Sequence, residues 1–352
     1  MSAKFFWQLP VQGDGRSVRR PGWVRGDYGG HAERDWVFAR TGKPRDGYHY
    51  FDYLAQVAGA ANLTRFDGVW IPQSEAGEEP LITAGAFVRE ARHLTFVPSL
   101  RAPLISAVYS AKIANSFQRL SGGRLALHLH SEEDRADTWH GRHWSRDEQL
   151  DYSAEFLDVF KGFWADEPFT YEGRHFLVEN GGFPPALAGQ PIPEFYLSGL
   201  GDKAFALSAR HADVHVLDLA PLDEIRDQVG TLTRLAAAQG RTLAFALRAH
   251  VVARSDAGEA WELLRGQWEG DDFDAHIRGE RIWAGFDDHG AVPAAGLVGS
   301  YQDIIDEVRN YAGAGISRFI FSARPALEEV YRFAEKVLPF ARIATSDLKQ
   351  AV

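Results

Sequence analysis

Short apolar runs recur along the whole chain, and each is followed by a longer segment with helical spacing. Residues 4–9 read KFFWQL, residues 95–100 read TFVPSL and residues 318–322 read RFIFS. Runs that are apolar at successive positions suit a sheet that is covered on both faces. Alternation of such strands with helices is typical of parallel βα units. The sequence therefore predicts an α/β fold with a parallel sheet.

The alternation repeats eight times in a chain of 352 residues. It favours one (β/α)8 TIM barrel over an open doubly wound sheet, which the pattern alone does not exclude. We expect strands at residues 4–9, 68–72, 95–100, 125–130, 194–198, 213–218, 244–252 and 318–322. We expect helices at residues 50–61, 107–119, 153–163, 203–210, 222–239 and 301–312.

Two stretches without a steady period interrupt this rhythm, at about residues 13–47 and 266–299. Loops of this length are usually lids or binding loops, although a plain surface excursion is the alternative. We expect both to be insertions at the C-terminal face of a single domain that spans residues 1–352.

Composition excludes several classes of function. A net charge of −10 with mixed signs disfavours nucleic acid as a partner. The absence of cysteine excludes disulfides, thiolate metal sites and cysteine nucleophiles. The N-terminus lacks the pattern of a signal peptide, and no window approaches the roughly 20 apolar residues of a membrane span. We expect a cytoplasmic protein that is not bound to a membrane.

The sequence LSGLGDKA, residues 197–204, predicts a strand end, a Gly-x-Gly turn and a helix. Gly199, Leu200 and Gly201 would let backbone N–H groups at the helix N-terminus face a phosphate. Read as G-x-G-x-x-A with Asp218 further on, the segment also resembles a dinucleotide fingerprint. A plain glycine turn is the structural alternative.

Arg248 and His250 are two residues apart on one predicted strand, so their side chains share a face. On the inner face of a barrel a charged side chain needs a ligand or a counter-charge. The pair is interpreted either as an anion clamp with a proton donor or acceptor, or as a buried pair satisfied by local carboxylates.

Arg324 follows the last predicted strand and would lie on the catalytic rim of a barrel. Its guanidinium suits a sulfonate or phosphate, although an isolated arginine is more often a surface ion-pair partner. The His-rich and acidic segment at residues 128–144 has no clear metal-binding spacing, so we expect no metal site.

Taken in order, several motifs resemble the bacterial-luciferase-like flavin monooxygenases, and most closely their alkanesulfonate and sulfoquinovose monooxygenase branch. The resemblance covers nearly the whole chain. Its markers are FFWQLPVQGDG, FDGVWIP, LRAP with SAVYSAKIANSFQRLSGGRLA, DYSAEFLDVFKGFW, LSGLGDKAFALSARHADVHV, LRAHVVAR, IWAG, GLVGS and FSARPALEEVYRFAEKVLP.

This resemblance implies a two-component oxygenase. Reduced FMN would come from a separate NAD(P)H-dependent flavin reductase, and O2 would be used to cleave the C–S bond of an organosulfonate into sulfite and an aldehyde. A homo-oligomer, dimer or tetramer, is also implied. A deazaflavin-dependent reductase, a nicotinamide-dependent dehydrogenase and a non-catalytic flavin or sugar binding protein are the competing interpretations.

Site residues carry over from the family position by position. Arg248 and His250 match its active-site Arg-x-His, and the turn from Gly199 to Gly201 matches its flavin-phosphate loop. The strand-end residues expected to flank the flavin ring are Trp7, Gln8, Ser99, His130 and Ser131.

Departures from the family pattern leave the substrate open. The chain has Gly77 where alkanesulfonate enzymes have a cysteine, Arg324 where they have a tyrosine, and Gly201 in place of a serine. It also lacks the arginine of the late loop, and we expect Arg324 to replace it as the sulfonate ligand. A sugar sulfonate is favoured over a simple alkanesulfonate because polar and aromatic side chains suit a hydroxylated ligand; they are Trp23, Trp36, Trp139, His140, His143 and Trp283.

Overall fold

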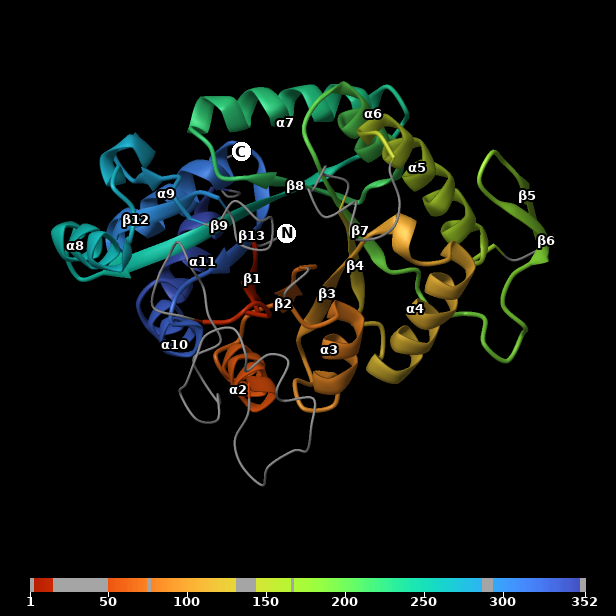
Figure 1. Ribbon diagram of the computed structural model, residues 1–352, viewed down its shortest axis with the longest axis horizontal. Coiled ribbons are helices and arrows are strands. Elements are labelled where there is room, and N and C mark those ends of the chain that lie inside the picture. Colours follow the sequence, from red (N-terminus) through yellow and green to blue (C-terminus); the bar gives the residue numbers. More distant parts are fainter. Residues whose placement is uncertain are drawn as a thin grey trace.

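The computed structural model describes residues 3–14, 50–74, 77–130, 144–165, 168–286 and 294–348. Its parallel strands form a closed ring in the order β1, β2, β3, β4, β7, β8, β9 and β13, and β13 pairs again with β1. The β8–β9 pairing closes the ring, which confirms the predicted TIM barrel over the open sheet. Figure 1 shows the strands at the centre, surrounded by helices.

The barrel strands lie where the sequence predicts them, with ends that differ by no more than two residues. Differences of this size are usual, because strand ends depend on the neighbouring strands. The strands are β1 (Lys4–Gln8), β2 (Gly68–Ile71), β3 (Thr95–Leu100), β4 (Ala126–Leu129), β7 (Glu194–Ser198), β8 (Val214–Asp218), β9 (Ala244–Arg254) and β13 (Ile316–Ser322).

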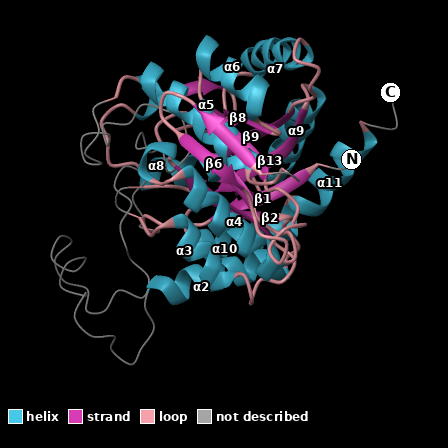
Figure 2. Cartoon of the chain, turned by 90° about the vertical axis from the view of Figure 1, so that its right-hand side faces the viewer, coloured by secondary structure: helices cyan, strands magenta, loops and turns pink. Residues whose placement is uncertain are grey.

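Helices enclose the barrel from outside, as Figure 2 shows with helices in cyan and strands in magenta. They are α2 (Tyr50–Leu63), α3 (Pro80–Phe87), α4 (Ala107–Ser121), α5 (Arg146–Gly162), α6 (Asp202–His211), α7 (Leu222–Ala237), α8 (Ala257–Gln267), α9 (Tyr301–Gly313), α10 (Ala326–Lys336) and α11 (Leu338–Asp347). α5 begins earlier than predicted because Ser145 and Glu148 form a capping box ahead of its apolar part.

Strands outside the barrel were not predicted. β5 (Phe169–Glu172) and β6 (Leu177–Gly181) form a separate antiparallel hairpin. The predicted loop at residues 266–299 contains β10 (Ile277–Gly279) and β11 (Ile282–Trp283) and most of β12 (Gly296–Ser300). β12 pairs with the second half of β9, beyond the point where β8 ends. The long strand β9 therefore extends from the barrel wall into this additional sheet.

Alternation of side chains along each strand divides the core into two layers. The barrel interior holds apolar side chains from every barrel strand: Phe6, Trp70, Val97, Ala126, Tyr196, Val214, Val216, Ala246 and Ile320. The neighbouring positions point outward and form a much larger layer between strands and helices, where Trp7, Val69 and Phe96 are fully buried. In the part of the chain that the structure describes, no helix has the length and apolar character that a bilayer crossing requires.

Candidate active site

Inward-facing side chains change from apolar to polar toward the carboxyl ends of the barrel strands. Two residues beyond the apolar interior, every strand except β2 carries a polar residue, and β2 is followed there by Pro72. Sites of TIM barrels are built at this end of the strands. The polar layer consists of Gln8, Ser99, His128, Ser198, Asp218, Arg248 and Ser322.

A second, basic set of residues lies one step further along four of the strands. Arg101, His130, His250 and Arg324 each follow a member of the polar layer by two residues. Arg101 and Arg324 are nine-tenths buried, which is unusual for arginine. Guanidinium groups held at a barrel mouth suit oxyanions such as phosphate or sulfonate.

Arg248 is held by a carboxylate of the neighbouring strand. Its Nε lies 2.7 Å from Asp218 Oδ1, and its Nη2 lies 3.2 Å from Asp218 Oδ2. Asp218 is the register partner of Arg248 across the β8–β9 pair. The predicted charged residue therefore has a counter-charge, and Asp218 serves an ion pair rather than the ribose contact of a dinucleotide fold.

His250 is buried and bonded to the next strand. Its Nδ1 lies 2.9 Å from Ser322 Oγ, and its ring packs at a tilt against Phe286 with centroids 4.2 Å apart. Burial, with the nearby positive charge of Arg324, holds the pKa of His250 well below its usual range. The imidazole is therefore neutral near pH 7, and Nε2 is the nitrogen that remains to exchange a proton with a ligand.

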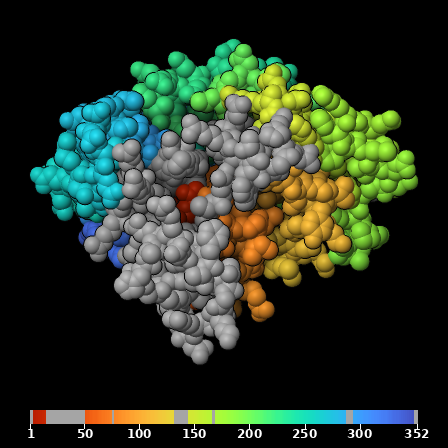
Figure 3. All heavy atoms as spheres, viewed as in Figure 1, coloured from red at the N-terminus to blue at the C-terminus, as the bar shows by residue number. Residues whose placement is uncertain are grey.

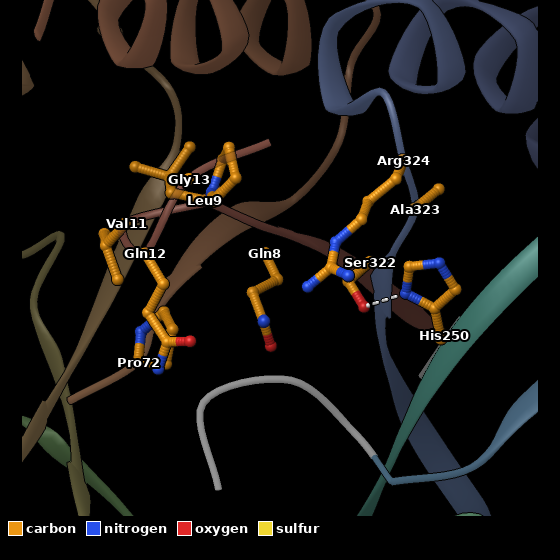
Figure 4. Close-up of a pocket in the computed structure, with 11 residues that line it drawn as sticks. Gln8, Leu9, Val11, Gln12, Gly13, Pro72, His250, Ser322, Ala323 and Arg324 are labelled. Carbon is orange, nitrogen blue, oxygen red and sulfur yellow. Dashed lines mark hydrogen bonds between the residues drawn. The ribbon is translucent and has the colours of Figure 1, made fainter. Parts of the chain in front are cut away.

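A pocket opens beside His250 and Ser322. Figure 4 shows the guanidinium of Arg324 directed toward Gln8 and the Ser322 hydroxyl, with Gln12 on the opposite wall. The N-terminal segment that supplies this wall is visible in red at the centre of the face in Figure 3. The full lining is Gln8, Leu9, Pro10, Val11, Gln12, Gly13, Pro72, His250, Ser322, Ala323 and Arg324.

On the other side of the mouth, His128 bridges two serines. Its Nδ1 lies 2.8 Å from Ser99 Oγ, and its Nε2 lies 3.0 Å from Ser198 Oγ. Burial, together with the nearby positive charges of Arg101 and Arg248, lowers the pKa of the adjacent His130 to about 3. Both rings are therefore neutral hydrogen-bonding groups at physiological pH.

The predicted Gly-x-Gly turn follows β7 and starts α6. Gly199 and Gly201 have φ angles of +124° and +92°, a region that favours glycine. No side chain among the described residues caps α6, so its first N–H groups suit an anion. Arg146 donates to the Leu200 carbonyl and adds positive charge beside the turn. These residues therefore suit a phosphate group.

The predicted position of Trp7 beside the flavin ring needs correction. Its side chain packs in the outer layer against Phe66 and Phe333, with ring centroids 5.4 and 5.9 Å away. Adjacent strand residues point to opposite faces, so Trp7 faces the helices and only Gln8 faces the barrel mouth. The structure therefore does not bring the Trp7 side chain to the candidate site.

Trp283 is also unavailable for stacking on a sugar. It is fully buried, its Nε1 donates to the Phe273 carbonyl at 3.0 Å, and it packs against Phe273 and Phe286. The remaining predicted residues lie outside the described part of the chain: Trp23, Trp36, Ser131, Trp139, His140 and His143.

Sequence reasoning missed Arg101, His128, Ser198 and Ser322, and it did not pair Asp218 with Arg248. The sequence pattern that could have identified them is the alternation along each strand. Two positions after an inward-facing apolar residue, the next inward-facing residue at the strand end is polar. Of the predicted residues, the structure brings Gln8, His250 and Arg324 together in one pocket.

Comparison with known families decides the assignment of the chain. A model described as luciferase-like monooxygenase matches residues 35–318. The chain belongs to the luciferase-like monooxygenase family. The family is named for a monooxygenase, and the closed barrel of this chain agrees with the luciferase-like fold.

Several solved structures share the luciferase-like fold. EDTA monooxygenase (EmoA) from Chelativorans sp. BNC1 aligns over 97% of this chain and 94% of its own, at 16% identity and a TM-score of 0.73. Riboflavin lyase (RcaE), solved with modified FMN and riboflavin, aligns over 97% and 92%, at 14% identity and 0.72. An F420-dependent secondary alcohol dehydrogenase aligns over 97% and 99%, at 16% identity and 0.69. At these identities the likeness concerns the fold alone.

Proposed function

We propose that this protein is a two-component monooxygenase that uses reduced FMN and O2 to cleave the C–S bond of an organosulfonate. The observation that carries the proposal is the meeting of two anion-binding features at the barrel mouth. Buried Arg248 lies midway along β9, level with the end of β8, and buried Arg324 follows β13 by two residues. The N-terminus of α6, which no described side chain caps, follows β7. A flavin phosphate and a substrate sulfonate are two anions that would use them.

The flavin site is proposed for the β3, β4 and β7 side of the mouth. Gly199 and Gly201 would admit the phosphate to the N–H groups of α6, and Ser99 and His130 would lie toward the ring. Reduced FMN, when bound, supplies the two electrons with which O2 is activated. An NAD(P)H-dependent flavin reductase is the proposed partner that delivers it.

The sulfonate site is proposed for the pocket beside His250. Arg324 would bind the sulfonate oxygens through its forked N–H groups, and Gln8 and Gln12 would bind hydroxyl groups of the substrate. These amides support a sugar sulfonate such as sulfoquinovose. Trp283, which was expected to contact the sugar, does not contribute to this argument because it is buried. A simple alkanesulfonate is the alternative, since Leu9, Val11 and Pro72 add an apolar wall.

The overall reaction balances without any further reactant. One oxygen atom of O2 enters the aldehyde and the other leaves as water, while reduced FMN becomes FMN. The C–S bond breaks with its electron pair on sulfur, which leaves as sulfite. In this proposal His250 Nε2 would accept the proton of the hydroxyl on the reacting carbon, since Nδ1 is bonded to Ser322.

A sulfite assay tests this proposal. The purified protein is mixed with FMN, NADH, a flavin reductase and O2, and with sulfoquinovose, octanesulfonate or no substrate. Sulfite from the sugar alone supports the sugar sulfonate, and sulfite from octanesulfonate alone supports the alkanesulfonate. No sulfite from either, with the flavin reduced and O2 present, would overturn the desulfonating function.

A deazaflavin-dependent reductase is the second candidate. It is kept because an F420-dependent alcohol dehydrogenase shares this fold over nearly the full length of both chains. The same phosphate turn would then bind the phosphate of F420, and O2 would not be consumed. Oxidation of reduced F420 by a carbonyl substrate under anaerobic conditions would distinguish this candidate from the oxygenase.

A further inference from the structure

Three strands are tied together inside the barrel mouth by one imidazole. His128 on β4 is 2% exposed, and its two ring nitrogens lie 2.8 Å from Ser99 Oγ on β3 and 3.0 Å from Ser198 Oγ on β7. Its ring also packs on Trp70, with centroids 4.5 Å apart. The orientation of the imidazole is therefore determined from both ends and from one face.

The His128 imidazole is neutral, so its two hydrogen bonds differ: one nitrogen donates and the other accepts. Burial, with His130 and Arg248 nearby, holds the pKa of His128 well below its usual range. A neutral ring has one N–H donor and one acceptor nitrogen, so it donates to one serine and accepts the hydroxyl hydrogen of the other. The orientation of one serine hydroxyl therefore depends on the orientation of the other, through the imidazole between them.

Ser198 connects this bridge to the phosphate turn. It is the last residue of β7 and directly precedes Gly199, Leu200 and Gly201. Glycines at positive φ have wide conformational freedom, so the turn depends on what holds its two ends. One end is the start of α6, and the other end is Ser198 with its bond to His128.

We propose that His128 is a positioning residue for the flavin phosphate, acting through the hydroxyl of Ser198 on the Gly199–Gly201 turn. This inference rests on the proposed flavin function. It assigns His128 no contact with the substrate. Removing the bridge should weaken the binding of FMN, which carries a phosphate. It should weaken riboflavin much less, because riboflavin is affected only through the lost bond to Ser99.

The test compares FMN with riboflavin by fluorescence titration of the full-length chain. In His128→Phe the ring is kept against Trp70 and both hydrogen bonds are lost, and we expect the Kd for FMN to rise about tenfold, the effect of roughly one lost hydrogen bond. The Kd for riboflavin should change less than threefold. His128→Gln carries one donor and one acceptor, so it should restore FMN binding to within about threefold of the unmodified protein.

Ser198→Ala isolates the proposed route. It should reproduce the loss of FMN affinity, and the double variant with His128→Phe should bind FMN no more weakly than either single variant. If His128→Phe does not fold, the Kd values for FMN and riboflavin are still compared in Ser198→Ala and His128→Gln. Additive effects in the double variant would overturn the route through Ser198.

His215 offers a matched control for general destabilisation. It is also fully buried and bonded to a serine, with Nδ1 2.8 Å from Ser208 Oγ, and its ring packs against Phe205 in the helix layer. Ser208 lies in the second half of α6, away from the turn at the start of that helix. His215→Phe should lower the melting temperature without changing the ratio of the Kd for FMN to the Kd for riboflavin.

Two results would overturn the inference. One is an equal change of that ratio in both histidine variants, and the other is equal weakening of FMN and riboflavin binding in His128→Phe. Failure of the unmodified protein to bind either flavin would instead overturn the proposed function.

Discussion

Asp218 and Arg248 face each other in register on β8 and β9 and form a two-point ion pair at the barrel mouth. The Asp218 side chain is 43% exposed, whereas that of Arg248 is 8% exposed. The carboxylate therefore stays partly hydrated while it orients a buried guanidinium. Orientation, rather than stability, is the main contribution expected of a pair with one exposed partner.

Replacing Arg248 tests its role in stabilising charge. Arg248→Ala should lower the rate of sulfite release by at least about 10²-fold with the fold intact, as expected for the loss of a charge-stabilising donor. Arg248→Lys should not restore the rate, because lysine cannot make the two-point contact with Asp218. Steady-state kinetics and circular dichroism are the measurements, and near-normal turnover of Arg248→Ala would remove Arg248 from the proposed mechanism.

Replacing Asp218 tests the orientation of that guanidinium. Asp218→Asn keeps the shape and removes the charge, so we expect a smaller loss of turnover, about tenfold. Asp223→Asn is the matched control, since Asp223 forms an exposed pair with Arg226 on the surface of α7. That control should retain normal kinetics.

Arg324 should govern substrate rather than flavin. Arg324→Gln should raise the KM for the sulfonate about 10- to 100-fold, because a charge-assisted contact to an anion is replaced by a neutral amide. The Kd for FMN should change less than twofold. Arg265→Gln on α8, which removes an exposed pair with Asp274, serves as control. A parallel loss of FMN binding in Arg324→Gln would place Arg324 at the flavin instead.

Gly201 should be required for its backbone conformation. A Cβ there would meet nothing within 4 Å, so space is not the constraint. Its φ of +92° and ψ of 165° lie in a region that is essentially restricted to glycine. Gly201→Ala should therefore raise the Kd for FMN about tenfold or more and leave riboflavin nearly unchanged.

Gly240 provides the control for backbone strain. It has a φ of +68° and equally open surroundings, but it lies beyond α7, before the amino end of β9. Gly240→Ala should lower stability by about 1 kcal/mol without affecting either flavin. Equal effects of both glycine variants on FMN binding would contradict a phosphate role for the turn.

Stability should fall in acid partly because of His215. Burial lowers the pKa of His215 to about 4 in the folded chain. Between its usual value near 6.5 and 4, the unfolded chain binds a proton that the folded chain does not, so the free energy of unfolding falls as the pH falls. The contribution has a limiting slope of about 1.4 kcal/mol per pH unit.

Urea denaturation at pH 7, 5.5 and 4.5 measures this contribution. His215→Gln should be less stable than the unmodified protein at pH 7, and the difference should shrink toward pH 4.5. His211, whose pKa is lowered to about 3, is present in both proteins and cancels in the comparison. A difference that stays constant with pH would exclude the titration of His215.

Element boundaries were predictable wherever local rules decide them. The apolar runs that became β1 and β13 are read directly from the sequence, because strand periodicity and glycine or proline punctuation act over a few residues. The same local rules did not predict the strands around residues 266–299. β10, β11 and β12 are short and gain their hydrogen bonds from one another and from β9 rather than from a local pattern.

The sequence alone determined the alternation of strands and helices, the spacing that puts Arg248 and His250 on one face, and the glycines that permit the turn after β7. The tertiary structure decided which face that is, since closure of the barrel turns Gln8 inward and Trp7 outward. It also decided the partners: Arg248 with Asp218, His250 with Ser322, and His128 with Ser99 and Ser198. These pairs are separated by 29 to 72 residues along the chain and meet only through strand register, which depends on the whole ring and not on any local segment.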